Sequence, residues 1–340
     1  MSCNYKIGMA DRKSPLSLSI LRRTVIGALA VVAPLALLPV AASAQTRPLE
    51  VVATTAMIGD AVKAVGGERV NVEVLLGQGV DPHLYKPTRA DIAKLAKADM
   101  IVANGLSLEA QFRDTFEQLG RAKPVVLAGE RLPKDRLLAA QDYKDKPDPH
   151  VWMDPGLWTA AVGAVRDALS ARDPAGKQAY DQGHDRYVGE IGGLSDYVKR
   201  ALASIPKDKR ILLTAHDAFS YFGRAYDIEV IGIQGVSTES EAGLKKIEEV
   251  VDLVVSRKLP SIFVESSVSD RNVKAVVEGA ARRGHTVSIG AELFSDAMGT
   301  PGTYEGTYLG MIDHNATTVT RALGGEAPQR GLHGRLGAAT

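Results

Sequence analysis

Residues 175–204, AGKQAYDQGHDRYVGEIGGLSDYVKRALAS, contain no proline and are long enough for about eight helical turns. As one helix they would be about 45 Å long, because each residue adds about 1.5 Å. A helix of that length could span two lobes and join them rigidly. The alternative is two shorter helices, broken near Gly192 and Gly193. In either case, this stretch separates two halves of the chain that share one pattern.

Both halves alternate short, apolar, β-branched runs with helical patterns. The predicted strands are residues 49–54, 70–75, 100–103, 124–127, 210–214, 229–233, 261–264 and 286–289. The predicted helices include residues 89–97, 106–119, 156–172, 218–226, 241–257 and 270–283. Short apolar strands that are each followed by a helix predict parallel sheets. We therefore expect an α/β fold of two lobes, each with a parallel four-stranded sheet flanked by helices, joined by one long linker helix.

The chain opens with a segment that is typical of export. Arg22 and Arg23 precede an uncharged apolar run at residues 24–40, and Ala42-Ser43-Ala44 supplies small residues for cleavage. This order predicts a signal peptide that is cleaved, exported by either the Sec or the Tat route, with a transmembrane anchor as the alternative. The predicted organisation is a signal peptide at 1–44, a first lobe at 46–173, a linker helix at 174–204, a second lobe at 205–326 and a flexible tail at 327–340.

Charge and cysteine content narrow the classes of function. Residues 1–44 hold five basic residues and one acidic residue, so 36 Lys and Arg remain against 39 Asp and Glu, a formal charge of −3. No clustered basic excess remains, and we expect no nucleic-acid partner. The one cysteine, Cys3, lies before the apolar run, which leaves no thiolate ligand and no cysteine for a lipid anchor. We expect a monomer in the periplasm that is not lipid-anchored.

Three of the seven histidines occupy positions where chains place ligands. His83 lies in the motif DPHLY, His150 lies in the similar motif DPHVWMD, and His216 follows a predicted strand. Loops at the carboxyl ends of parallel strands converge on a ligand cleft, and neutral imidazole is a natural ligand for zinc and related ions. Asp81 and Asp148 could bind the second nitrogen of the neighbouring imidazoles.

A carboxylate is expected to complete such a site, because it offsets the charge of a divalent ion. The candidates are Asp296 in LFSDAMG and Glu265 in FVESS, which both follow predicted strands of the second half. The residues alone do not choose between them. The other histidines fit structural or solvent-exposed positions: His184, His285, His314 and His333.

Six motifs in order resemble those of the TroA-like metal-binding proteins of bacterial zinc and manganese ABC importers. They are DPHLYKPT, DPHVWMDP, LLTAHDAFSYFGRAY, IGIQGVSTESEAGL, IFVESSVS, and LFSDAMG followed by GTYEG, and the resemblance covers residues 48–325. It implies two α/β lobes joined by one long helix, and delivery of the metal to a membrane permease with its ATPase. It also implies Glu265 as a supporting residue, and a set of four metal ligands: His83, His150, His216 and Asp296.

The resemblance implies Zn²⁺ or Mn²⁺ as the transported ion. Three imidazoles and one carboxylate favour zinc over manganese for the same ligands, and manganese-type members often carry a glutamate at the position of His216. Zinc-specific members often carry a long loop rich in His and Asp, whereas residues 129–149 contain no histidine. Members with three histidines and one aspartate take both metals, so both remain expected.

Two other functions are alternatives: a zinc-dependent hydrolase, and a binding protein for an organic solute. The chain lacks the HExxH, GxSxG and GxxxxGK[ST] motifs, and four protein ligands would leave little room for an activated water. Clefts for organic solutes usually offer aromatic platforms, but aromatic residues make up 5% of this chain. We therefore expect a metal carrier and not an enzyme.

Overall fold

The computed structural model describes residues 47–140 and 145–337. They belong to one compact unit, residues 43–340, and the account below concerns that unit. The predicted signal peptide at residues 1–44 lies outside the described residues. Among the helices of the described part, none combines the length and apolar character needed to cross a membrane.

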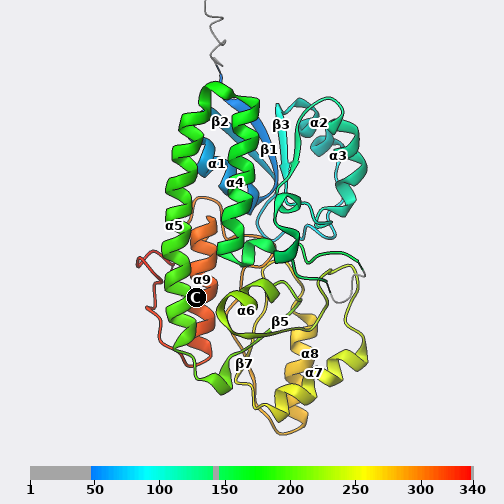
Figure 1. Ribbon diagram of the computed structural model, residues 1–340. Coiled ribbons are helices and arrows are strands. Elements are labelled where there is room, and N and C mark those ends of the chain that lie inside the picture. Colours follow the sequence, from blue (N-terminus) through cyan, green and yellow to red (C-terminus); the bar gives the residue numbers. More distant parts are fainter. Residues whose placement is uncertain (1–46, 141–144, 338–340) are drawn as a thin grey trace, which may run out of the picture. The chain divides into compact units, whose positions relative to one another are not determined.

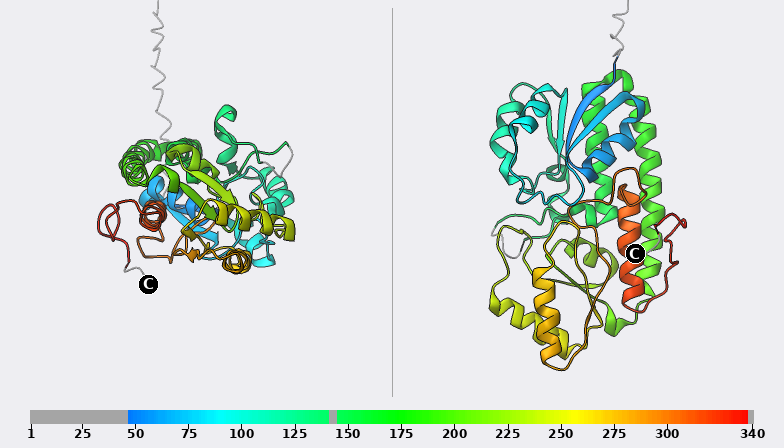
Figure 2. Two further views of the ribbon diagram at one scale, coloured as in Figure 1. Left: turned by 90° about the horizontal axis from the view of Figure 1, so that it is seen from below. Right: turned by 180° about the vertical axis from the view of Figure 1, so that it is seen from behind.

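The first half of the unit is built on one parallel sheet with the strand order β2-β1-β3-β4. Its strands are β1 (Leu49–Thr55), β2 (Val70–Leu76), β3 (Met100–Ala103) and β4 (Val125–Leu127). Its helices are α1 (Ala56–Gly66), α2 (Arg89–Lys97), α3 (Arg113–Gly120) and α4 (Pro155–Arg172). Helices α1 and α4 lie on one side of the sheet, and α2 and α3 lie on the other (Figures 1 and 2). All four strands end at the same edge of the sheet, because they run in parallel.

Side-chain caps set where helices of this half begin. At α2, the Thr88 hydroxyl accepts the backbone N–H of Asp91 at 3.2 Å, and the Asp91 carboxylate accepts the backbone N–H of Thr88 at 2.8 Å. At α4, Asp154 accepts the backbone N–H of Leu157, and Pro155 occupies the first helical position. These contacts satisfy amides that have no partner inside the helix.

The predicted helix at residues 106–119 begins later, with α3. Leu106 and Ser107 have φ angles of 55° and 66°, which a right-handed helix does not allow. The buried carboxylate of Glu109 stabilises this turn by accepting the backbone N–H of Asn104 at 2.9 Å. A side-chain bond to the backbone therefore overrides the apolar period on which the prediction rested.

The second half repeats the alternation with shorter strands. It contains β5 (Ile211–Thr214), α6 (Ser220–Tyr226), β6 (Glu229–Gly232), α7 (Leu244–Ser256), β7 (Ser261–Ile262), α8 (Arg271–Arg282), β8 (Ser288–Ile289) and α9 (Tyr308–Ala322). The four predicted strands form two parallel pairs, β5-β6 and β7-β8, instead of one continuous sheet. Strand β7 has two residues, and both pair with β8. One hydrogen bond, from the N–H of Phe263 to the carbonyl oxygen of Leu213 at 2.9 Å, still joins the two pairs.

Between the halves, α5 (Lys177–Ala203) is a single unbroken helix of 27 residues, about 40 Å long. Gly192 and Gly193 do not interrupt it, because both are exposed and keep the helical conformation. Near its start α5 packs closely on α1, where a Cβ at Gly183 would lie 2.3 Å from the carbonyl oxygen of Val65. The helix then continues alongside α9 (Figure 1).

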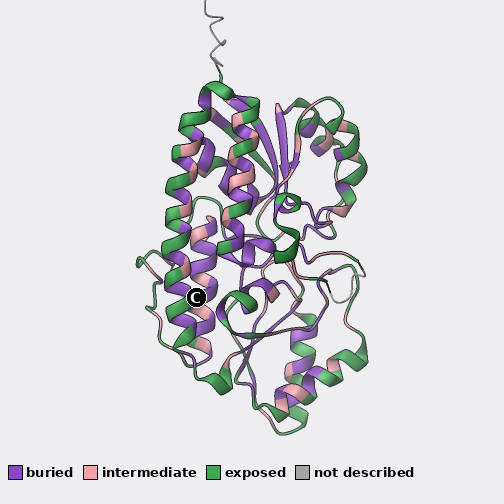
Figure 3. Ribbon diagram, in the orientation of Figure 1, coloured by how far each residue is buried: buried purple, intermediate pink, exposed green. Residues whose placement is uncertain are grey.

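One apolar core extends through both halves of the unit, and the inward faces of α5 and α9 are buried in it (Figure 3). Tyr308, at the start of α9, shows how the halves are joined. Its hydroxyl donates to the carbonyl oxygen of Trp152 at 2.8 Å, and its ring packs against Trp158 with the ring centroids 5.5 Å apart. The first residue of α9 is therefore anchored in the first half.

The described part of the predicted flexible tail, residues 327–337, is packed against the second half. The backbone N–H of Leu332 donates to the buried carboxylate of Asp313 at 3.0 Å, and that of Gly337 donates to Glu305 at 2.6 Å. The prediction of flexibility rested on the missing apolar period. Backbone bonds to carboxylates of the second half hold the segment instead, and such bonds leave no periodic signal in the sequence.

Candidate metal centre

His83 lies in a turn that follows β2. The Asp81 carboxylate closes this turn, because its Oδ1 accepts the backbone N–H of His83 at 2.8 Å. Its other oxygen, Oδ2, accepts the hydroxyl of Thr238 at 2.6 Å, a contact from the second half of the chain. We expected Asp81 to bind the His83 ring, but it binds the backbone of the turn and thereby sets where the ring lies.

His150 ends the second D-P-H motif. Asp148 Oδ1 accepts both the backbone N–H and the ring Nδ1–H of His150, at 2.9 and 2.7 Å. Because a carboxylate only accepts, this bond places a proton on Nδ1 and leaves Nε2 as the atom that can bind a metal. Tyr221 in turn donates its hydroxyl to the carbonyl oxygen of Asp148 at 2.8 Å, which fixes the motif against α6.

His216 follows β5 and is held in the same way by Glu265. One Glu265 oxygen accepts the backbone N–H of His216 at 2.8 Å, and the other lies 2.5 Å from the ring Nδ1. Both residues are buried. The Nε2 atom of His216 is therefore turned towards the centre of the site, as in His150.

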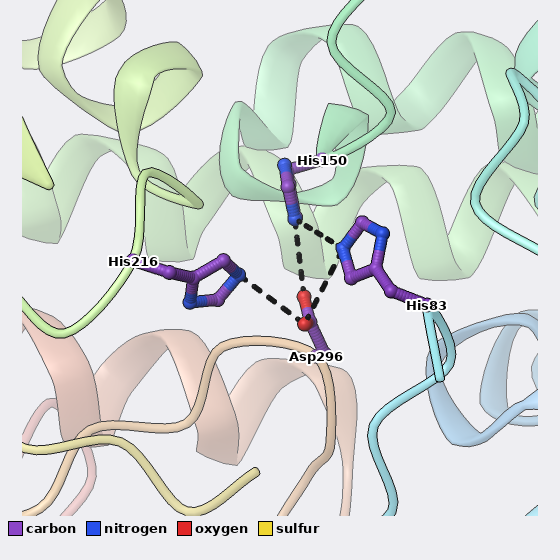
Figure 4. A group of neighbouring side chains, drawn as sticks. All are labelled: His83, His150, His216 and Asp296. Carbon is purple, nitrogen blue, oxygen red and sulfur yellow. Dashed lines mark hydrogen bonds and ion pairs between the residues drawn. The ribbon is translucent and has the colours of Figure 1, made fainter. Parts of the chain in front are cut away.

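Asp296 lies in the loop between β8 and α9, with its carboxylate among the three rings (Figure 4). Its Oδ1 is 3.2 Å from His150 Nε2, and its Oδ2 is 3.3 Å from His216 Nε2 and 3.7 Å from His83 Nε2. Apart from these ring nitrogens, no described residue offers either oxygen a hydrogen bond. A buried carboxylate in that state is costly unless a cation shares its charge.

The spacing of the four side chains fits one four-coordinate ion. One ligand atom from each lies within 4.8 Å of the others. A tetrahedral zinc ion with bonds of about 2.0–2.1 Å separates its ligand atoms by roughly 3.3 Å. The distances from Asp296 to His150 and His216, 3.2 and 3.3 Å, are close to that value, and so is the 3.4 Å between the Nε2 atoms of His83 and His150, whereas the 3.7 Å from Asp296 to His83 is longer. The group could therefore hold a divalent metal ion.

The pKa values of His83 and His150 shift in opposite directions, because burial dominates at His83 and neighbouring charges dominate at His150. Burial lowers the pKa of His83 to about 3. Burial also disfavours the charged form of His150, but the carboxylates of Asp148 and Asp296 outweigh it and raise the His150 pKa to about 9. At neutral pH the metal-free site therefore keeps His83 neutral and His150 protonated.

On the other side of the site, His216 and Asp296 carry opposite charges that stabilise each other. Burial works against the charged form of His216, but the charges of Glu265 and Asp296 raise its pKa well above the ordinary value. Burial likewise opposes ionisation of Asp296, yet the neighbouring imidazoles hold its pKa well below the ordinary value. A metal ion that binds here must displace protons from the rings.

Comparison with known proteins agrees with this geometry. The family described as "Zinc-uptake complex component A periplasmic" (ZnuA) matches residues 51–322. The chain belongs to this family. The match includes all four residues of the site and both halves of the unit, and the family is one of substrate-binding proteins.

Individual members of the ZnuA family cover most of the chain. The "Manganese-binding lipoprotein MntA" of Bacillus subtilis is 44% identical over 277 residues, 82% of this chain and 90% of that protein. The "Zinc-binding protein TroA" of Treponema pallidum is 45% identical over 282 residues, 83% and 91% of the two proteins. The solved structure of that periplasmic zinc-binding protein superposes with a TM-score of 0.79 at 44% identity, covering 81% of this chain and 99% of that one. The predicted family and α/β fold class are thus confirmed.

The same relatives contradict the predicted localisation. MntA is named a lipoprotein, and so is the "Manganese ABC transporter substrate-binding lipoprotein PsaA" of Streptococcus pneumoniae, which is 30% identical over 282 residues, 82% of this chain and 90% of that protein. The prediction that the protein is not lipid-anchored is therefore wrong. It rested on the absence of a cysteine after the apolar run, and an absence cannot outweigh relatives that are named lipoproteins.

The remaining histidines lie outside the group of four. His184 contacts Asp185 on α5, His285 bonds the carbonyl oxygen of Leu259, and His314 bonds the carbonyl oxygen of Glu292. His333 lies in the packed tail segment.

The sequence did not reveal the contacts of three side chains that support the proposed ligands. Thr238 bonds Asp81 from the second half, Trp152 donates its indole N–H to the carbonyl oxygen of Ser295, and Asn104 donates to the carbonyl oxygen of Pro149. Thr238 and Trp152 lie inside two of the six motifs. Their partners are more than 100 residues away, so the motifs marked these positions but not their contacts.

Proposed function

We propose that this protein captures a divalent transition-metal ion, zinc or manganese, and delivers it to an ABC importer. The observation that carries the proposal is the convergence of three imidazole nitrogens and one buried carboxylate, with one ligand atom from each within 4.8 Å of the others. The ligands would be His83, His150, His216 and Asp296. Asp148 and Glu265 would orient two of the rings, and Asp81 would hold the turn of the third.

The donor set supports zinc as the more tightly bound ion in vitro. Three nitrogens and one oxygen suit zinc, and the affinity order of divalent ions places zinc above manganese for equal ligands. The relatives include one protein named for manganese and one named for zinc, at nearly equal identity. Availability of each ion in the cell would then decide which one is carried.

The site supports a role in transport and not in catalysis. Catalytic zinc keeps a position open for water, whereas here four protein groups surround the central point. The Glu265 carboxylate, which could act as a base, is already engaged by the backbone and ring of His216.

The expected partners are a metal-specific permease and its ATPase. The relatives named as ABC transporter substrate-binding proteins support this assignment. We further propose that the protein acts as a monomer, without a nucleic-acid partner. Residues 1–44 would serve as its export signal. Residues 46–173 and 205–326 would form the two metal-binding lobes on either side of the helix at 174–204.

The test is titration of zinc and manganese into the metal-free protein, followed by calorimetry and thermal melting. A metal that binds only the native state must raise the melting temperature. His216→Ala and Asp296→Ala should each weaken zinc binding by at least about 100-fold, since each removes one of four ligands. The control His184→Ala, on the surface of α5, should bind like the wild type. Wild-type affinity in both ligand variants would refute the site, and the absence of any metal-induced stabilisation would refute the function.

A further inference from the structure

The oxygen ligand Asp296 lies on a short segment, residues 292–296, between β8 and α9. One side of this segment pairs with the chain that carries Glu265, through a parallel β-bridge between Leu293 and Glu265. The backbone N–H and the carbonyl oxygen of Leu293 make the two hydrogen bonds of this bridge, at 2.9 and 3.0 Å. In a strand, the backbone groups of the next residue point to the opposite side. Those of Phe294 therefore point away from Glu265 and towards α9.

A side chain of α9 takes the place of a second neighbouring strand. The backbone N–H of Phe294 donates to Asn315 Oδ1 at 2.9 Å, and Asn315 Nδ2 donates to the carbonyl oxygen of Phe294 at 2.7 Å. A primary amide offers a donor and an acceptor, so one asparagine satisfies both backbone groups. Asn315 is fully buried. Because a buried backbone group without a partner is costly, these two bonds fix Phe294 relative to α9.

Three other side chains also bind the segment: His314 at the carbonyl oxygen of Glu292, Trp152 at the carbonyl oxygen of Ser295, and Ser267 at the Ser295 hydroxyl. These bonds remain when the Asn315 amide is removed. The segment would therefore stay near its place, but its middle residue would lose both partners. Loss of the amide should shift the carboxylate of Asp296 without releasing it.

We propose that Asn315 is a positioning residue for Asp296 and that, by fixing this carboxylate, it supports the binding of manganese more than the binding of zinc. This proposal rests on the proposed function, because it concerns a ligand of the same site. Asn315 is not one of the four residues of the metal group. It acts through the backbone of Phe294, two residues before Asp296.

The two ions depend on the carboxylate to different degrees. Manganese prefers oxygen ligands, whereas zinc is well suited to imidazole nitrogen. Among the four residues of the group, Asp296 alone supplies oxygen. A displaced carboxylate thus takes away the ligand that manganese binds best and leaves zinc its three rings. A variant that only lowers stability behaves differently, because a smaller fraction of native protein weakens the binding of both ions by the same factor.

The experiment measures the dissociation constants of zinc and manganese for the metal-free protein, by chelator competition and by calorimetry. Asn315→Ala removes both bonds to Phe294. We expect the dissociation constant to rise about 30-fold for manganese, within the range for lost outer partners of metal ligands, and about fivefold for zinc. Asn315→Ser, whose hydroxyl is too short to make both bonds, is measured in the same way and serves if the alanine variant does not fold.

Thr317→Val, also on α9, is the matched control. Thr317 is buried, and its hydroxyl bonds Asp313 at 3.1 Å and Tyr197 at 2.7 Å. Like Asn315→Ala, this substitution removes two buried hydrogen bonds of α9 and should lower the free energy of unfolding. It should leave both dissociation constants at their wild-type values.

Repeating Asn315→Ala in an Asp296→Ala background tests whether the amide acts through the carboxylate. There the substitution should have little further effect on zinc affinity. The same fivefold effect in that background would overturn the proposal. So would wild-type affinities in both Asn315 variants, an equal loss for the two ions, or a wild type that binds zinc but not manganese. Failure of the wild type to bind either ion would instead refute the proposed function, so the two failures are distinguishable.

Discussion

The indole N–H of Trp152 donates to the carbonyl oxygen of Ser295 at 2.9 Å, across 143 residues of sequence. Trp152 lies two residues after His150 and packs edge-on against its ring, and Ser295 directly precedes Asp296. One hydrogen bond therefore joins the segment that carries His150 to the segment that carries Asp296, two of the proposed metal ligands.

Removing this bond should weaken metal binding. Trp152→Phe keeps an aromatic ring against His150 but loses the donor, and a buried hydrogen bond contributes about 1 kcal/mol. We expect zinc affinity to fall about fivefold, measured by competition with a chelator. Trp158→Phe is the matched control, because Trp158 is equally buried and its indole N–H has no hydrogen-bond partner among the described residues. Equal losses of affinity in the two variants would contradict a specific role for Trp152.

The Glu265 carboxylate should determine which nitrogen of His216 is free. Glu265→Gln has nearly the same shape, but its amide can donate to Nδ1 and thereby place the ring proton on Nε2, the atom that faces the metal. We expect zinc affinity to fall about 10- to 100-fold, the range for lost partners of metal-bound histidines. Calorimetric titration measures this change.

Asp173→Asn is the control for that substitution. Asp173 is also a buried carboxylate, but it lies in the connection between α4 and α5, where it binds Arg69 and Tyr180. Loss of this carboxylate in Asp173→Asn should lower the free energy of unfolding without changing the affinity for zinc. If Glu265→Gln bound zinc as tightly as Asp173→Asn does, control of the tautomer by Glu265 would be excluded.

Metal binding should release protons at neutral pH. In the metal-free protein the pKa of His150 is raised to about 9 and that of His216 is also raised, so both rings are protonated at pH 7, whereas His83, with a pKa of about 3, is neutral. A metal must displace the two Nε2 protons, so affinity rises with pH. We expect the zinc dissociation constant to increase about 100-fold for each pH unit lost between roughly pH 8 and 6.

Calorimetry in buffers with different ionisation enthalpies counts the displaced protons. Two protons per zinc at pH 7 is the expected result. A count of zero would show that the carboxylates do not hold His150 and His216 in the charged form.

Two tyrosines of α5 should differ in their contribution to stability. The Tyr187 hydroxyl donates to the Asp60 carboxylate at 2.6 Å, and the same carboxylate accepts the backbone N–H of Tyr308 at 3.1 Å. The Tyr197 hydroxyl bonds the Thr317 hydroxyl at 2.7 Å. Tyr187→Phe should lower the free energy of unfolding by about 2 kcal/mol and Tyr197→Phe by about 1 kcal/mol, because bonds to carboxylates are stronger than bonds between neutral groups.

Urea unfolding of both variants without metal tests this order. Both tyrosines are nearly fully buried, so loss of the hydroxyl is comparable in its effect on packing. A larger loss in Tyr197→Phe would show that Asp60 does not join α5 to the start of α9 in solution.

Much of the fold could be predicted from local signals. Strand β3 and helix α2 have the predicted bounds, because an apolar β-branched run and a capping box act within a few residues. The helix predicted at residues 106–119 failed where the buried Glu109 stabilised a turn instead. The four strands predicted for the second half form two pairs instead of one sheet, because pairing depends on how the strands pack together, which an apolar run does not reveal.

The two D-P-H motifs show which contacts follow from neighbouring residues in the sequence and which depend on the tertiary structure. In both, the sequence alone determined that the aspartate accepts the backbone N–H of the histidine two residues later, at 2.8 and 2.9 Å, because that contact closes within a single turn. The tertiary structure decided the rest: Asp148 also binds the ring of His150, whereas Asp81 turns to Thr238, 157 residues away. Identical local sequences thus acquired different roles. Both contacts of the Asp148 carboxylate with His150 stay within its own motif, whereas the second partner of Asp81 comes from a distant part of the chain, and only folding brings it within hydrogen-bonding distance.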